Sequence, residues 1–276
     1  MASIERIGVY DFPTQQSVKL DRGPLLAEVG VGEVVLLVEP LWGGAWAPYL
    51  TPEALCARTF KLRSRLGLSV TWAFRAKAAA SWLRGVQRFL ERVRQLSAQE
   101  TFNLPSAMEW VPTGARFVGA PANNEHFDTL ATVTRSMRRW ATGRMDMPFS
   151  VATMLTTSRS LVSYREGGHS LVLDGRSGRG TVRAAGAAQR DACRDLEPGD
   201  VVCLAAAGQD AVAIEKPDGT VSRECRLEDV MTASLEAAVA AGARRVRYWC
   251  LQDLVGDDGQ LTRAGVWIKS ACKRYG

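Results

Sequence analysis

The clearest hydrophobic pattern in the chain lies in residues 75–97 and predicts an amphipathic α-helix. Its apolar positions are separated by four, three, four and three residues: Trp82, Val86, Phe89, Val93 and Leu96. This spacing places the five side chains on one face of a helix. The opposite face carries Arg84 and Arg88, which either remain in solvent or contact phosphate groups.

Short apolar or alternating runs predict β-strands in most of the remaining first 150 residues. The runs cover residues 4–12, 17–20, 25–29, 34–38, 69–74, 101–104, 116–119 and 127–133. Turn-forming proline, glycine and asparagine residues lie between them. Residues 1–150 are therefore predicted to form a β-rich domain that contains one long helix, 75–97.

The second half of the chain, residues 151–276, is predicted to form a separate, small α+β domain. Strands are expected at 169–173, 181–185 and 201–205. Pro217-Asp218-Gly219 joins residues 210–216 to 220–225 in a predicted β-hairpin. An alanine-rich helix at 227–241, closed by Gly242, precedes a strand at 244–251. The predicted fold class is α+β, in two domains.

Composition restricts the class of protein only moderately. The chain has 276 residues, 46% of them hydrophobic, and a net charge of +6, so it has enough apolar residues for a large core. The mild basic excess permits contact with a polyanion without requiring it. No leader segment and no membrane-spanning run is recognised, which predicts a cytoplasmic location, or a virion if the protein is packaged.

The cysteine and histidine residues give no familiar catalytic or metal-binding pattern. The six cysteines are far apart and are expected to be free thiols in the core: Cys56, Cys193, Cys203, Cys225, Cys250 and Cys272. The chain has two histidines, His126 and His169, and no serine-hydrolase elbow, Walker loop or dinucleotide fingerprint. No catalytic residue, metal or cofactor is therefore predicted.

Two groups of residues are candidates for binding other macromolecules. Large aromatic residues in loops suit a subunit interface or the core of the monomer: Trp42, Trp46, Tyr49 and Trp110. Arginines around a tryptophan suit nucleic acid, together with Arg84 and Arg88 of the predicted helix: Arg135, Arg138, Arg139, Trp140 and Arg144. The alternative for this second group is a surface turn with Trp140 buried.

Residues 66–105 show a pattern that resembles minor tail proteins of long-tailed bacteriophages. A strand with a tryptophan, 69–74, is followed by the amphipathic helix and then by Thr101-Phe102-Asn103-Leu104-Pro105. The resemblance implies a tail-tip or baseplate component that packs against neighbouring subunits in a ring.

These observations favour a non-enzymatic structural or assembly protein of a virion, which acts through homo- or hetero-oligomeric packing. A nucleic-acid-binding protein that uses the arginine clusters is the second hypothesis. An enzyme of unrecognised type is the third.

Overall fold

In the computed structural model, the part of the chain that is described consists of several separate ranges. They are residues 4–11, 22–38, 47–76, 80–98, 104–112, 136, 139, 149–155, 169–173, 182–194, 196, 199–205, 212–215, 221–225, 227–249 and 251–276. Structural statements below refer to these ranges.

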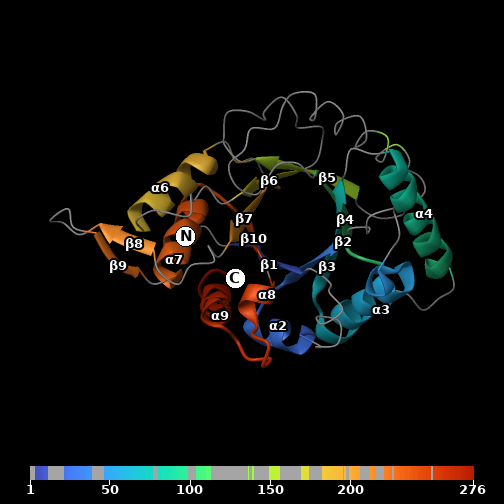
Figure 1. Cartoon of the computed structure of the whole chain (residues 1–276), viewed down its shortest axis with the longest axis horizontal. Helices are drawn as coiled ribbons and strands as arrows, with labels where there is room; N and C mark the ends of the chain where they lie inside the picture. Colours follow the sequence, from blue (N-terminus) through green and yellow to red (C-terminus); the bar gives the residue numbers. More distant parts are fainter. Residues whose placement is uncertain are drawn as a thin grey trace.

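Parallel strands form a closed barrel at the centre of the molecule (Figure 1). Its members are β1 (Arg6–Asp11), β2 (Glu33–Val38), β3 (Ser69–Ala76), β4 (Ala107–Pro112), β5 (Phe149–Leu155), β6 (His169–Leu173), β7 (Val201–Ala205) and β10 (Arg245–Trp249). From β1 to β7 each strand pairs with the next in the sequence, β7 pairs with β10, and β10 pairs with β1 to close the ring. This order is that of a (β/α)8, or TIM, barrel.

Helices surround the barrel on the outside (Figure 1). They are α2 (Gly23–Val29), α3 (Pro52–Phe60), α4 (Ala80–Ser97), α6 (Val182–Ala192), α7 (Leu227–Ala240), α8 (Leu251–Leu254) and α9 (Arg263–Tyr275), with shorter turns η1 (Pro48–Leu50) and η2 (Lys61–Arg65). An antiparallel hairpin, β8 (Val212–Glu215) with β9 (Val221–Cys225), lies apart from the barrel. No helix in the described ranges is both long enough and apolar enough to span a bilayer.

Strands β1 and β2 are buried on both faces, which explains the nearly continuous apolar sequence of β2. In β2 all six residues are buried, and Val34, Leu36 and Val38 belong to the core beneath the helices. Parallel strands covered by helices on one face and by the barrel interior on the other have this composition. Trp72 and Phe74 of β3 pack edge-on against Phe89 of α4, with ring centroids 6.1 and 5.9 Å apart.

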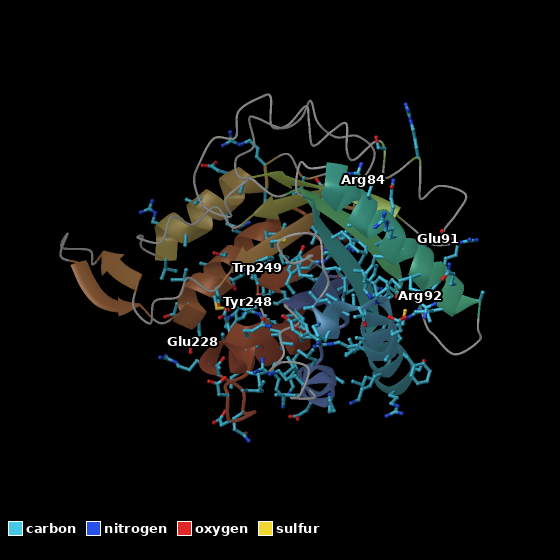
Figure 2. All side chains as sticks on the ribbon, turned by 45° about the vertical axis from the view of Figure 1, so that its right-hand side comes forward. Arg84, Glu91, Arg92, Glu228, Tyr248 and Trp249 are labelled. Carbon is cyan, nitrogen blue, oxygen red and sulfur yellow. The ribbon has the colours of Figure 1, made fainter. Side chains whose placement is uncertain are left out.

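The amphipathic helix predicted over residues 75–97 is confirmed as α4, which begins at Ala80, whereas residues 75 and 76 belong to β3. Val86, Phe89 and Val93 are buried, whereas Arg84 and Arg88 are exposed. Arg84, Glu91 and Arg92 are labelled along α4 in Figure 2. Arg92 Nε donates to Glu53 Oε1 at 2.8 Å and so joins α4 to α3.

The predicted α+β fold class in two domains is wrong. Strands from residues 1–150 and from 151–276 belong to one parallel sheet, and the expected boundary at residue 150 falls inside β5. Residues 25–29 and 181–185, expected as strands, lie in α2 and largely in α6. Short apolar runs fit buried parallel strands, antiparallel strands and short helices alike, so their periodicity did not separate these structures.

Candidate active site

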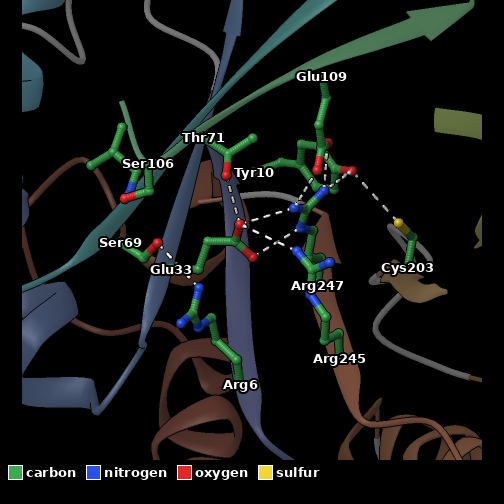
Figure 3. A network of polar contacts seen from close by, with 11 residues as sticks. Arg6, Tyr10, Glu33, Ser69, Thr71, Ser106, Glu109, Cys203, Arg245 and Arg247 are labelled. Carbon is green, nitrogen blue, oxygen red and sulfur yellow. Dashed lines mark hydrogen bonds and ion pairs between the residues drawn. The ribbon is translucent and has the colours of Figure 1, made fainter. Parts of the chain in front are cut away.

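An ion-pair network lies inside the barrel. Arg247 of β10 binds the carboxylates of Glu33 in β2 and Glu109 in β4, each through two hydrogen bonds (Figure 3). The Arg247 nitrogens lie 2.9 and 3.0 Å from the Glu33 oxygens and 2.6 and 2.7 Å from the Glu109 oxygens. All three side chains are buried. We call Arg247, Glu33 and Glu109 the barrel ion-pair network.

The barrel geometry brings these three residues together from distant parts of the sequence. Going round the ring, β2, β4 and β10 are the second, fourth and eighth strands, and alternate strands contribute side chains to the same interior layer. Gly8 of β1 pairs with both Glu33 and Arg247. A Cβ atom at Gly8 would lie 3.0 Å from Glu33 Oε2 and 3.2 Å from Arg247 Cγ, so glycine leaves the space that the network occupies.

Neighbouring polar groups complete the network. Tyr10 Oη accepts a hydrogen bond from Arg247 Nη1 at 3.3 Å, and Thr71 Oγ1 donates to Glu33 Oε1 at 2.8 Å. Arg247 therefore makes five hydrogen bonds, the number of donors that a guanidinium has. Arg245 forms a longer ion pair with Glu33, 3.8 Å between Nη2 and Oε1. Two carboxylates thus face two guanidinium groups.

Burial and charge determine which of these groups ionise. Burial opposes ionisation of Glu33, but the charge and hydrogen bonds of Arg247 outweigh it and lower the pKa of this carboxyl. Burial raises the pKa of the Cys203 thiol to about 12 and raises the pKa of the Tyr10 hydroxyl well above its ordinary value. Cys203, whose Sγ lies 3.8 Å from Tyr10 Oη, is therefore a neutral thiol and not a thiolate nucleophile at neutral pH.

The lowered pKa of Glu33 predicts a loss of stability in acid. Because the folded pKa lies below the ordinary value of 4.5, the contribution is present above that pH and is lost as pH falls through the folded pKa. Each unit of pKa difference contributes about 1.4 kcal/mol. Urea unfolding across a pH series should therefore show a shallower acid slope for Glu33→Gln than for the wild type. Glu5→Gln, at an exposed position, should keep the wild-type slope, and equal slopes for all three proteins would contradict this account.

The carboxyl end of the barrel carries a half-buried aromatic residue at its mouth. Trp249 is the last residue of β10 and follows Arg247 by two positions, so it points to the same interior side. Its ring lies 5.0 Å from that of Tyr10, centroid to centroid, at an interplanar angle of 52°. Tyr10 thus connects Trp249 to the barrel ion-pair network beneath it.

A second polar group lies at the same end of the barrel, outside β1. Asp11, the last residue of β1, is fully buried and forms an ion pair with Arg58 of α3. Gln252 Nε2 of α8 donates to Asp11 Oδ1 at 3.3 Å, and the charge of Arg22 also acts on this carboxyl. Burial raises the pKa of Asp11 despite the opposing charges of both arginines. We call Asp11, Arg22, Arg58 and Gln252 the rim cluster.

The residues predicted as an interface are not brought together among the described residues. Tyr49 lies in η1, half-buried against the core, and Trp110 lies in β4 with its backbone paired to Phe74 and Val151. Trp42 and Trp46 fall outside the described residues.

The predicted nucleic-acid surface is likewise only partly described. Arg84 and Arg88 are exposed on α4, and Arg139 is exposed elsewhere. Four of the predicted residues fall outside the described ranges: Arg135, Arg138, Trp140 and Arg144.

The cysteine prediction is confirmed for the four cysteines whose side chains are described. Four cysteines are buried free thiols, as expected: Cys56, Cys193, Cys203 and Cys272. His169 begins β6, and His126 lies outside the described residues. In the described ranges, histidine, cysteine, aspartate and glutamate form no group suited to a metal ion.

Sequence reasoning missed the residues that the fold places in and above the barrel. Glu33 directly precedes the buried run Val34–Val38, and Arg247 is a fully buried charged residue in the middle of β10. A charged residue inside a buried strand requires a partner, and this signal was present in the sequence.

Comparison with known proteins identifies the fold. No family model and no curated protein matches the chain. Among solved structures, a family 5 glycoside hydrolase (subfamily 18) from Streptomyces cattleya, in complex with GlcNAc, is 18% identical with a TM-score of 0.59, covering 100% of this chain and 81% of the other. A family 18 chitinase from Cycas revoluta, in complex with (GlcNAc)4, is 9% identical with a TM-score of 0.57, covering 98% of this chain and 100% of the other. D-psicose 3-epimerase from Clostridium cellulolyticum, with D-tagatose, is 8% identical with a TM-score of 0.52, covering 97% and 96%. The chain shares the barrel fold of these enzymes.

This finding overturns the predicted virion function. The predicted non-enzymatic component of a phage tail or baseplate is wrong, because the whole chain superposes on barrel enzymes rather than forming a β-rich assembly module. The strand and helix that suggested it, β3 and α4, are consecutive parts of the barrel and its outer layer. The resemblance of residues 66–105 to tail proteins, the oligomeric partners and the location stay predictions.

Proposed function

We propose that this chain is an enzyme that acts on a carbohydrate, bound at the carboxyl mouth of the barrel. In TIM-barrel enzymes the active site lies at the carboxyl ends of the strands. The three solved structures described above are enzymes named with a saccharide or monosaccharide in their complexes. Hydrolases and an epimerase share this feature, so it favours a substrate class more strongly than a single reaction.

The position of Trp249 carries the proposal. An indole ring at the mouth offers a flat apolar face to the C–H face of a sugar ring. Trp249 is half-buried and points to the interior side of the barrel. Binding sites typically combine such aromatic surfaces with a few fixed polar groups.

The barrel ion-pair network supports this surface from below. Arg247 holds the hydroxyl of Tyr10, and the ring of Tyr10 contacts that of Trp249. A binding surface whose supporting side chains are fixed by packing and hydrogen bonds loses little conformational entropy when a ligand binds. Arg247 is thus a positioning residue for the mouth.

Glu33 and Glu109 are assigned to the same supporting role. Glycoside hydrolysis uses one carboxyl group as an acid and a second as a base or nucleophile, on opposite sides of the bond that is cleaved. Here both carboxylates face the same guanidinium group, and the pKa of Glu33 is lowered, which disfavours a proton donor. The proposal therefore names a substrate class and a site, and hydrolysis is the reaction to assay first.

The test is an assay of the purified chain against a panel of β-linked gluco-, manno- and N-acetylglucosamine oligosaccharides and free ketoses, with products separated by chromatography. We expect turnover of at least one member. Trp249→Ala should reduce kcat/KM by roughly 30-fold, the effect of losing about 2 kcal/mol of aromatic contact. Phe60→Ala removes an exposed aromatic residue from the end of α3 and should leave kcat/KM unchanged. The absence of turnover and binding across the panel, or an unchanged Trp249→Ala enzyme, would refute the proposal.

A further inference from the structure

The rim cluster contains buried guanidinium nitrogens that have no hydrogen-bond partner. Arg22 is 9% exposed, and its Nε and Nη1 atoms are buried without a hydrogen-bond partner. Arg58 uses Nη2 for Asp11, while its Nη1 is also buried and without a partner. A buried guanidinium nitrogen that donates no hydrogen bond is costly, because it has lost its hydration without compensation.

The rim cluster also carries more positive than negative charge. Two guanidinium groups face one carboxylate, that of Asp11, which Arg58 and the Gln252 amide already engage. One positive charge therefore remains in a largely buried site. Arginine presents donors in a planar fork that matches the oxygens of a carboxylate or a phosphate.

Arg58 is the more exposed member of its ion pair with Asp11. Its side chain is 19% exposed, whereas that of Asp11 is 0% exposed. Asp11 ends β1 and Tyr10 precedes it, so the rim cluster and the proposed mouth are at the same end of the same strand. The two side chains point to opposite faces of β1, since Tyr10 contacts Arg247 inside and Asp11 contacts α3 and α8 outside.

From these contacts we propose that Arg22 and Arg58 form a binding site for an oxyanion, a phosphate or carboxylate group. This site lies on the outer face of β1, opposite the face that carries Tyr10, and is therefore separate from the proposed saccharide site. Arg22 supplies two unused donors and Arg58 one, and Asp11 with Gln252 holds Arg58 in place.

If Arg22 binds an anion, replacing it should weaken anion binding without lowering the stability of the ligand-free protein. A purely structural role for Arg22 would instead predict a loss of stability. Arg22→Gln should leave the melting temperature of the ligand-free protein unchanged or raise it, because an unpartnered buried charge is removed. The same variant should weaken binding of inorganic phosphate by about tenfold or more, the effect of losing charge-assisted hydrogen bonds. Arg84→Gln, at an exposed position of α4, should change neither quantity.

The experiment is calorimetric titration of the full chain and both variants with inorganic phosphate, glucose 6-phosphate, glucuronate and glucose. We expect Arg22-dependent binding of an anionic ligand, and comparison of the phosphate esters with glucuronate identifies the anion. Binding of no anion, equal binding by Arg22→Gln, or strong destabilisation of the ligand-free Arg22→Gln protein would overturn the inference. Anion binding without turnover of any saccharide would refute only the proposed function. Turnover of neutral saccharides without anion binding would refute only this inference.

Discussion

Replacing Arg247 with methionine should lower the free energy of unfolding by about 3–5 kcal/mol. Methionine keeps an unbranched side chain of similar reach but removes the positive charge. Glu33 and Glu109 would then face each other inside the barrel without their shared guanidinium group. A buried charge that loses its partner is among the most destabilising changes in proteins.

The reason for this large effect is the position of Arg247 within the ring of strands. Its side chain joins β10 to β2 and β4. Neither strand is a neighbour of β10 in the sheet, because β1 separates β10 from β2, and β1, β2 and β3 separate it from β4. Loss of Arg247 would also remove the hydrogen bond that holds the Tyr10 hydroxyl. We therefore expect the variant to bind saccharides more weakly as well as to unfold more easily.

The matched control is Arg244→Met, one residue before β10. Arg244 and its partner Glu5 are 73% and 58% exposed, and exposed ion pairs contribute about 0–1 kcal/mol. Urea denaturation of wild type and both variants measures the difference. If Arg247→Met were no less stable than Arg244→Met, the network would not have the structural role that we assign to it.

Replacing Trp72 with alanine should cost a similar amount, about 3–5 kcal/mol. Trp72 is fully buried between the barrel and the outer helices, and its ring packs edge-on against Phe89 of α4. Its Nε1 donates to Thr59 Oγ1 of α3 at 2.9 Å. Alanine would leave a cavity at the place where β3, α3 and α4 meet, and would also leave the Thr59 hydroxyl without this donor.

Trp72→Phe separates the two contributions of this side chain. Phenylalanine retains most of the apolar volume but cannot donate to Thr59, so its cost should be clearly smaller than that of alanine. The measurement is again the free energy of unfolding. Equal stability of wild type and Trp72→Ala would show that β3 and the helices do not pack as described.

Local patterns in the sequence were sufficient for elements whose structure depends on neighbouring residues. The four-and-three spacing in residues 82–96 predicted α4, and Pro217-Asp218-Gly219 predicted the β8–β9 hairpin. The helix at 227–241 and the following strand were also correct, as α7 and β10. For the two helices and the hairpin, the decisive contacts are within one element or one turn, whereas β10 pairs with the distant strands β1 and β7.

The barrel could not be predicted in the same way, because its closure depends on contacts between residues far apart. Gly8 pairs with Arg247, and Glu33 binds the same arginine from 214 positions away in the sequence. A buried charge such as Glu33 indicates only that a partner exists, whereas the ring of strands determines that the partner is Arg247. The sequence likewise places Trp249 in a strand at 244–251, but it does not show that this strand ends at the mouth of a barrel.

The most direct test of the account is a crystal structure of the chain with a bound saccharide found in the activity panel. We predict that a sugar ring lies against the indole of Trp249, at the carboxyl end of the barrel. A saccharide that bound only at the opposite end of the barrel, or on the outer face of α4, would contradict the proposal that the mouth is the active site.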